Sequence, residues 1–409
     1  METTIGRAPL RARGSIKRVL LVSNLYEPFV RGGAERSVAF LAQGLAQLGV
    51  EVHVATLGDA DGFEVRSGIC VHRIRQPNLY WLYRGAPYDW LKPTWHLLDL
   101  RNPLGRIRFA RILDEVRPDV VHTNNLSGFS TSVWAEPRNL GIPLVHSLRD
   151  YYLLCMRSSL FRNGVNCSSP CVACSVSSTI RRRSGRQVDG VIGVSQHVLD
   201  RHLRTGAFAD ALHTVIPNAY EIPSGEAPSD PADDGPVRLR YMGEISTAKG
   251  VDRLLRAMHD VPRTTHRLDL AGRPDAHAGS WFDPSSLDPH VKYLGPSTPS
   301  QVFRDAEVLV VPSAWEEPLG RVAIEAACWR VPVLASGNGG LNQLVHEYQL
   351  GWTLPDSAEE WSSTIRNLSR PAIRERRSRL DGVAELFHPR VIADLHLDFY
   401  SRASHRSGK

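Results

Sequence analysis

The sequence predicts an α/β fold made of two successive domains, each with a parallel β-sheet covered by helices. The chain has 409 residues, which is long for one ordinary hydrophobic core. Short apolar runs alternate with segments of helical periodicity in both halves, as in successive βαβ units. Between the halves, residues 221–236 are rich in Pro, Gly, Ser and Asp, a composition typical of a domain linker.

Composition and charge narrow the classes of function. Hydrophobic residues make up 42% and charged residues 22% of the chain, which is ordinary for a globular protein. The net charge of +6 suits anionic ligands or an anionic membrane surface. The chain contains no nucleic-acid recognition motif, so we expect no nucleic-acid partner.

The expected location is the cytoplasm. No apolar run approaches the roughly 18 residues of a membrane-spanning helix, and the basic N-terminus is not followed by the apolar segment of a signal peptide. In that compartment the six cysteines should be mostly reduced.

The N-terminal domain is expected at residues 16–220, after a polar, basic tail (residues 1–15) that we expect to be disordered. Its first unit is a buried strand at 18–23, a Gly-rich turn, a helix at 34–48 and a strand at 50–56. Further strands are predicted at residues 119–122, 143–147, 190–195 and 214–216.

The Gly-rich turn contains Gly32 and Gly33 immediately before the predicted helix. Glycines there let the backbone approach a ligand, and the N–H groups of a helix N-terminus attract phosphate. A loop that needs positive φ explains the pair equally well. The G-x-G-x-x-G spacing of a dinucleotide site is missing, which argues against a dehydrogenase.

Residues 80–113 interleave aromatic and basic side chains. This pattern fits a peripheral contact with the inner face of a membrane, or a groove for an acceptor molecule. It fits equally well a set of helices that pack on their own domain through aromatic stripes. The sequence leaves both interpretations open.

Four cysteines, Cys155, Cys167, Cys171 and Cys174, lie within one short insertion, residues 155–174. The spacing C-x3-C-x2-C of the last three favours a structural zinc site that pins the insertion and takes no part in catalysis. Disulfides are an alternative, which the expected compartment disfavours, and coincidence is another.

The C-terminal domain is expected at residues 237–387, and residues 388–409 predict a helix that packs back on the N-terminal domain. Within residues 308–336 the pattern is strand, turn, buried helix, strand, with Glu317 in the turn and Glu325 inside the helix. Carboxylates only accept hydrogen bonds and suit paired hydroxyls of ribose or a hexose. A helix N-terminus that favours acids explains Glu317 but not Glu325.

In this order the motifs resemble the retaining nucleotide-sugar glycosyltransferases of family 4. These have the GT-B fold, in which two Rossmann-like domains face each other across a cleft. The segment RDYYLLC at 149–155, followed by the cysteine cluster, is similar to a subgroup associated with surface-polysaccharide assembly. The resemblance rests on GGAE at 32–35, VIPN at 215–218, MGEISTAKG at 242–250, PSAWEEPLGRVAIEAA at 312–327 and GNGG at 337–340.

The resemblance implies a retaining, metal-independent hexosyltransferase with no catalytic cofactor. It would use a UDP- or GDP-sugar and a glycan or lipid-linked glycan acceptor in surface polysaccharide or glycoconjugate assembly. Glu325 would accept hydrogen bonds from the ribose hydroxyls, and Glu317 would lie near the donor sugar. The backbone at Gly32 and Gly33, and at Leu319 and Gly320 after Pro318, would hold the diphosphate. Lys249 would be its cation.

The chain departs from the family pattern at several positions. Glu244 stands where an Arg usually binds the diphosphate, and Arg321, Arg31 and Arg149 are candidates to replace that Arg. Arg149 itself stands where a His would contact the donor sugar, so it is a third candidate catalytic residue beside Glu317 and Lys249. Gln343 aligns with a common Glu and Arg330 with a common Gly.

These departures leave open a second function, a GT-B-like protein that binds a sugar nucleotide or glycan with weak or no turnover. A sugar-nucleotide epimerase of the same fold is less favoured, because it would have no use for the aromatic and cysteine-rich insertions.

Overall fold

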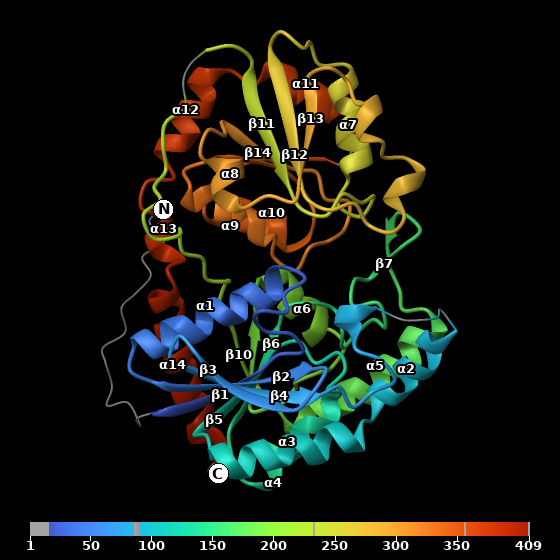
Figure 1. The fold of residues 1–409 in the computed structure, drawn as a ribbon, viewed down its shortest axis with the longest axis vertical. Coiled ribbons are helices and arrows are strands. Elements are labelled where there is room, and N and C mark those ends of the chain that lie inside the picture. Colours follow the sequence, from blue (N-terminus) through green and yellow to red (C-terminus); the bar gives the residue numbers. More distant parts are fainter. Residues whose placement is uncertain (1–15, 86–87, 89, 232–233, 356, 408–409) are drawn as a thin grey trace.

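The computed structural model describes residues 16–407 apart from 86–87, 89, 232–233 and 356, so the predicted tail at 1–15 lies outside the described residues. Two α/β domains lie one above the other, and residues 216–231 lead from the N-terminal domain to the C-terminal one (Figure 1). The α/β prediction of two Rossmann-like domains is confirmed. None of the described helices is long and apolar enough to cross a membrane.

The N-terminal domain is built on an eight-stranded sheet of order β10-β9-β6-β5-β1-β2-β4-β3. Its neighbouring strands run parallel except β3 and β4, which form an antiparallel hairpin at one edge. The strands are β1 (Arg18–Val22), β2 (Glu51–Gly58), β3 (Gly62–Arg66), β4 (Ile69–Arg75), β5 (Val120–Thr123), β6 (Leu144–Leu148), β9 (Gly190–Gly193) and β10 (Leu212–Val215).

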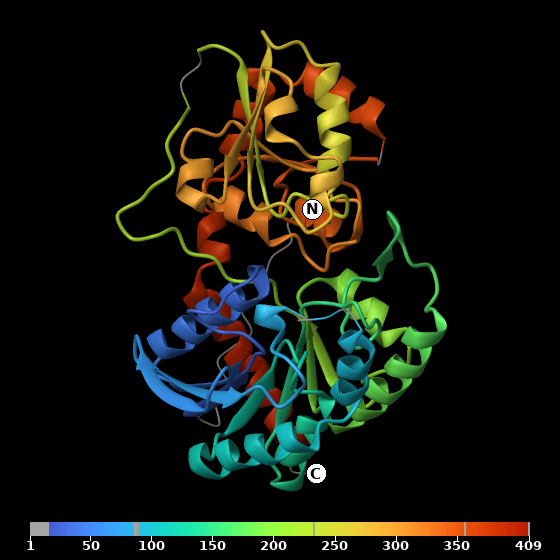
Figure 2. The ribbon, with the colours of Figure 1, turned by 45° about the vertical axis from the view of Figure 1, so that its right-hand side comes forward.

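Helices cover both faces of this sheet, and the central strands are therefore apolar on both sides, as in β1 and β6. The helices are α1 (Gly33–Gln47), α2 (Leu91–Leu100), α3 (Pro103–Val116), α4 (Ala135–Asn139), α5 (Val172–Ser184) and α6 (Gln196–Leu203), with short 3₁₀ turns at Leu82–Arg84, Thr131–Trp134 and Gly185–Gln187. A small hairpin of β7 (Phe161–Arg162) and β8 (Val165–Asn166) reaches toward the other domain (Figures 1 and 2).

The C-terminal domain has a six-stranded parallel sheet of order β13-β12-β11-β14-β15-β16. Its strands are β11 (Val237–Met242), β12 (His266–Ala271), β13 (Val291–Gly295), β14 (Val308–Val311), β15 (Val333–Ser336) and β16 (Gly351–Leu354). Its helices are α7 (Val251–His259), α8 (Pro299–Phe303), α9 (Arg321–Cys328), α10 (Gly339–Glu347), α11 (Ala358–Asn367), α12 (Arg370–Ser378) and α13 (Val383–Leu386), with 3₁₀ turns at Ala278–Ser280 and Pro284–Ser286.

The last helix, α14 (Pro389–Ser407), lies against the N-terminal domain (Figure 1). It packs beside α1 so closely that a Cβ at Gly44 would lie 2.1 Å from the carbonyl oxygen of Pro389. Further along α14, the Tyr400 hydroxyl lies 2.6 Å from Nδ1 of His122 on β5. The C-terminal helix is therefore part of the N-terminal core, which ties the two domains together at a second point.

Candidate active site

The carboxyl ends of the strands in both domains point to the domain interface, where parallel α/β sheets bind ligands. Several hydrogen bonds cross this interface. The Tyr151 hydroxyl donates to the carbonyl oxygen of Glu316 at 2.9 Å, and the Ser195 hydroxyl donates to the carbonyl oxygen of Pro318. The Asn166 side chain from β8 donates to Ala314 O at 2.8 Å. The turn that follows β14 is thus held by the opposite domain.

Glu317 lies in that turn and is 6% exposed. Nζ of Lys249, from the loop after β11, lies 2.9 Å from Oε1 of Glu317. The same ammonium group lies 4.9 Å from the centre of the Trp315 ring. Because β11 and β14 are neighbours in the sheet, their following loops meet, and this brings together a lysine and a carboxylate that are distant in sequence.

Glu325 lies inside α9 and is 4% exposed. Its carboxylate is paired with Arg321 one turn earlier, with Nη1 and Oε1 2.8 Å apart. The guanidinium carbon of Arg321 lies 5.6 Å from the centre of the Phe40 ring and 6.0 Å from that of Tyr220. Burial lowers the pKa of Arg321, while Glu325 opposes that shift. Both predicted carboxylates are therefore bound by cations.

Gly33 faces Arg321 across the interface, since a Cβ at Gly33 would lie 3.1 Å from Cδ of Arg321. Gly33 is the first residue of α1, so its N–H has no acceptor within the helix. The N–H of Gly32, in contrast, donates to Oε2 of Glu35 at 2.9 Å. The N–H of Gly32 is therefore capped by the Glu35 side chain, whereas that of Gly33 is left for another acceptor, and the assignment of both glycines to the donor site stays a prediction.

The turn at Leu319 and Gly320 needs its glycine. Gly320 has φ of +83°, and a Cβ there would lie 2.5 Å from Cδ1 of Leu341. Leu319 is 4% exposed and packs in the core. The GNGG segment packs on the same turn, where the N–H of Gly340 donates to Glu317 O at 2.7 Å. These contacts fix the backbone around Glu317 and the N-terminus of α9.

Arg149 follows β6 and is held by two asparagines. Its Nε donates to Oδ1 of Asn124 at 2.8 Å, and its Nη1 donates to Oδ1 of Asn218. Burial lowers the pKa of Arg149 to about 10, and the charge of Arg321 acts in the same direction. Arg149 therefore remains a cation at neutral pH, close enough to Arg321 for the two charges to interact.

The structure separates the three arginines proposed to replace the missing diphosphate ligand at position 244. Arg31 is exposed and donates to Tyr83 O at 2.7 Å, while Arg321 and Arg149 lie at the interface. The Glu244 side chain is exposed, so water screens its charge. All three stay candidates, and Arg321 and Arg149 are the two whose charges act on each other.

The cysteine cluster forms only in part. Sγ of Cys155 and Cys174 are 3.8 Å apart, and Cys171 caps α5, in which Cys174 lies. Cys155 and Cys174 are buried, whereas Cys171 is exposed and Cys167 is half-buried. Within the described ranges, no group of three or more His, Cys, Asp or Glu side chains is arranged to hold a metal ion. The zinc site stays a prediction, to be tested by metal analysis of the freshly purified, reduced protein.

The aromatic and basic segment at 80–113 divides into two sets of side chains. Trp81 and Trp95 are buried and pack in the domain. Trp90, Leu97 and Ile107 are 71%, 67% and 54% exposed. Packing within the domain therefore explains Trp81 and Trp95, whereas Trp90, Leu97 and Ile107 lie exposed on and beside α2 and α3.

Several residues at the interface were not singled out from the sequence. Asn124 and Asn218 orient Arg149, and Phe40 and Tyr220 flank Arg321. Only Asn218 had a motif, VIPN, that could have pointed to it.

Two facing Rossmann-like domains, with carboxylates and cations at the ends of their strands, define the fold of the protein as GT-B. A sequence profile of Glycosyltransferase Family 4 matches residues 31–222, and a profile of Glycosyl transferases group 1 matches residues 236–370. The chain belongs to glycosyltransferase family 4.

Comparison with individual proteins gives one relative in sequence and two solved structures with the same fold. The chain is 31% identical over 331 residues to an uncharacterized 42.6 kDa protein in the cps region of Klebsiella pneumoniae, covering 80% of this chain and 87% of that protein. Sucrose-phosphate synthase from Thermosynechococcus elongatus superposes with a TM-score of 0.73 at 21% identity, over 95% of this chain and all of the other. Anabaena HepE in complex with UDP gives 0.68 at 18% identity, over 94% and 100% of the two chains.

Proposed function

We propose that this protein is a retaining hexosyltransferase that moves a hexose from a UDP- or GDP-sugar to a glycan or lipid-linked glycan in surface polysaccharide or glycoconjugate assembly. The observation that carries the proposal is the presence of two ion pairs, Lys249–Glu317 and Arg321–Glu325, at one domain interface. They supply acceptors for sugar and ribose hydroxyls beside cations for a diphosphate. The matched families and the UDP complex of HepE support a nucleotide-sugar donor.

In this proposal Glu325 accepts hydrogen bonds from the ribose, and Glu317 accepts them from the hexose. Lys249, Arg321 and the N–H of Gly33 hold the diphosphate. As the glycosidic bond breaks, negative charge develops on that diphosphate, and fixed cations and helix N-termini stabilise it. The protein then needs no metal ion and no other catalytic cofactor.

Retention follows in the proposal from attack on the same face from which the diphosphate leaves. A donor phosphate oxygen takes the proton of the acceptor hydroxyl while the new glycosidic bond forms. The protein contributes mainly by holding the two reactants in position. Arg149 lies near Arg321 and is oriented by Asn124 and Asn218, so it is assigned to the region of the reacting sugar and leaving phosphate.

The acceptor side is assigned to the N-terminal domain. The exposed Trp90, Leu97 and Ile107 on and beside α2 and α3, among basic residues of the same segment, suit a peripheral contact with an anionic membrane surface. We assign the protein to the cytoplasm, at the inner face of the membrane when its acceptor is lipid-linked. The exposed set of side chains supports this assignment.

The second candidate is a protein of the same fold that binds a sugar nucleotide or glycan with weak or no turnover. It is favoured by Arg149, which stands where the family has a His and which already has two hydrogen-bond partners.

The test is a panel of UDP- and GDP-hexoses, with binding measured by titration calorimetry and sugar release measured by chromatography. Slow hydrolysis of one donor that is lost in Lys249→Ala supports the transferase. The control variant is Lys292→Ala, which should keep the hydrolysis because Lys292 is exposed on β13. Tight binding without any hydrolysis or transfer favours the binding protein. No binding of any nucleoside diphosphate contradicts both. Proton NMR of the first product reports whether the anomeric configuration is retained.

A further inference from the structure

The β7–β8 hairpin of the cysteine-rich insertion contacts the turn at residues 314–317, which we call the Glu317 turn. Asn166, the last residue of β8, uses both ends of its side-chain amide there. Its Nδ2 donates to the carbonyl oxygen of Ala314 at 2.8 Å, and its Oδ1 accepts from the N–H of Glu316 at 3.0 Å. One side chain of the N-terminal domain therefore fixes two backbone groups of the C-terminal domain that lie two residues apart.

The indole of Trp315, which lies between those two backbone groups in the chain, links the insertion to the donor site. Its Nε1 donates to the carbonyl oxygen of Ser159 in the insertion. Its ring packs edge-on against that of Tyr151, with the ring centres 6.5 Å apart. The ammonium group of Lys249 lies 4.9 Å from the centre of the same ring, as in a cation–π interaction. The insertion therefore reaches, through Trp315, the cation proposed to hold the diphosphate.

The place of Asn166 in the hairpin is set by the local sequence. Asn163 and Gly164, the two residues between β7 and β8, have φ of +53° and +80°, as in a type I′ turn. The N–H of Cys167, which follows Asn166, donates to the carbonyl oxygen of Leu160 at 2.7 Å and closes the hairpin. An isolated two-stranded hairpin is only marginally stable, so the contacts with the Glu317 turn help to order both partners.

The Glu317 turn is also joined to the lysine loop of its own domain. The N–H groups of Ala314 and Trp315 both donate to the carbonyl oxygen of Ala248, at 3.0 Å each. Lys249 comes next in the chain, and its Nζ lies 2.9 Å from Oε1 of Glu317. A shift of the turn would therefore move Trp315, Lys249 and Glu317 together. In a site that works by positioning, a displacement of roughly 1 Å can lower the rate about 10²-fold.

We propose that Asn166 is a positioning residue for sugar transfer, which acts through the Glu317 turn on Lys249 and Glu317. This inference rests on the proposed glycosyltransferase function, since it gives Asn166 a part in that reaction. Both hydrogen bonds of Asn166 are with backbone atoms of the turn, and the Arg321–Glu325 pair proposed to bind the nucleotide lies outside the turn. Loss of the Asn166 amide should therefore lower the rate of transfer much more than the affinity for the nucleotide.

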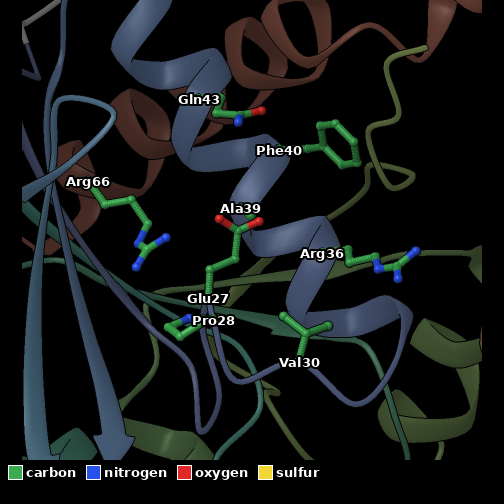
Figure 3. Close-up of a pocket in the computed structure, with 8 residues that line it drawn as sticks. All are labelled: Glu27, Pro28, Val30, Arg36, Ala39, Phe40, Gln43 and Arg66. Carbon is green, nitrogen blue, oxygen red and sulfur yellow. The ribbon is translucent and has the colours of Figure 1, made fainter. Parts of the chain in front are cut away.

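The first measurement is independent of activity and uses the full-length protein. Hydrogen–deuterium exchange of the Glu316 amide, followed by mass spectrometry of peptides that cover the Glu317 turn, should be about tenfold faster in Asn166→Ala, because that amide loses its acceptor. The matched control is Gln43→Ala, which removes a side-chain amide at the surface hollow beside α1 (Figure 3) and should leave this exchange unchanged. Thermal unfolding checks that both variants are folded. Equal exchange of the Glu316 amide in Asn166→Ala and in the wild type overturns the proposal.

The second measurement compares kinetics with binding. With a donor that the wild type turns over, kcat of Asn166→Ala should be about tenfold or more below that of the wild type, and Gln43→Ala should match the wild type. The Kd for UDP or GDP, measured by titration calorimetry, should change less than about twofold in both variants, because Arg321 and Glu325 are retained.

The outcomes separate this inference from the proposed function. Unchanged kcat in Asn166→Ala overturns the assignment of Asn166 and leaves the transferase intact, and so does an equal loss of kcat and of nucleotide affinity. A wild type that turns over no donor contradicts the proposed function, and the inference fails with it. The two failures are distinguishable because the first appears only in the comparison of the variant with an active wild type.

Discussion

Replacing Glu325 with Gln tests the assignment of the ribose site. Gln has almost the same size and shape, so the change removes the charge with little effect on packing. In the structure the Glu325 carboxylate is 4% exposed and lies 2.8 Å from Arg321. The variant therefore weakens two interactions, one with the proposed ribose hydroxyls and one with Arg321.

The two effects have different magnitudes and different readouts. A hydrogen bond to a charged acceptor contributes about 1.5–3 kcal/mol, and a loss of about 2 kcal/mol is roughly a 30-fold change in Kd. Removing one partner of a buried ion pair costs about 3–5 kcal/mol of stability. We therefore expect urea unfolding to show a lower free energy of unfolding for the variant, and calorimetry to show weaker nucleotide binding.

The decisive assay compares UDP with its 2′,3′-dideoxy analogue, or the guanosine pair if GDP is the ligand, on the wild type and on Glu325→Gln. The wild type should prefer the nucleotide with hydroxyls by roughly 30-fold, for the reason given above, and the variant should nearly lose this preference. Glu359→Gln, at an exposed position of α11, should retain it. An equal loss of affinity for both nucleotides in Glu325→Gln would refute the ribose assignment, because the effect would then arise from the displaced Arg321.

Three further predictions concern catalysis and stability. Lys249→Ala should lower the rate of donor hydrolysis or transfer about 10²-fold and affect donor affinity less, since the cation acts on charge that develops as the diphosphate leaves. If the variant and the wild type react at the same rate in rapid-mixing assays, Lys249 has no part in the mechanism. Arg149→Lys should lower the transfer rate about tenfold, because lysine has no planar fork to satisfy two amide oxygens at once; unchanged kcat with unchanged KM would exclude that role. Burial lowers the pKa of His202 to about 4 and that of His146 to about 3, so both are neutral in the folded chain and take up protons in the unfolded chain below about 6.5. The free energy of unfolding should then fall as the pH drops from 6.5 toward 4, by up to ~1.4 kcal/mol per pH unit for each histidine; urea titrations at pH 7 and 5 check this, and His202→Gln should reduce the difference.

The fold was predictable because its signals are local. Strands such as β1 and β14 are short apolar runs that are buried on both faces, and periodicity identifies them without knowledge of the rest of the chain. Gly320 is also a local signal, since a left-handed turn before a helix needs glycine. Carboxylates at such a turn and in a buried helix were enough to single out Glu317 and Glu325, which the structure pairs with Lys249 and Arg321.

The partners of these residues were not predictable, because they depend on strand order. The family resemblance implied that Lys249 binds the diphosphate and Glu317 the sugar, and the structure pairs the two side chains because β11 lies beside β14. Arg149 is held by residues that follow β5 and β10, and β10 is separated from β6 by β9. Hydrophobic periodicity identifies single strands and helices but not which strands are neighbours, so it could not predict these contacts.

The ion pairs also indicate how the proposed donor would change the electrostatics of the site. Without ligand, Glu317 and Glu325 neutralise Lys249 and Arg321, and Arg149 is a further positive charge close to Arg321. A diphosphate competes with the carboxylates for both cations, and each carboxylate that loses its cation gains a sugar or ribose hydroxyl instead. The two carboxylates and the two negative charges of the diphosphate then face the two cations Lys249 and Arg321, which leaves two excess negative charges. Counting Arg149 as well reduces the excess to one. An arginine at position 149, where a neutral histidine would leave the larger imbalance, is therefore consistent with a diphosphate site that has lost its usual arginine at position 244.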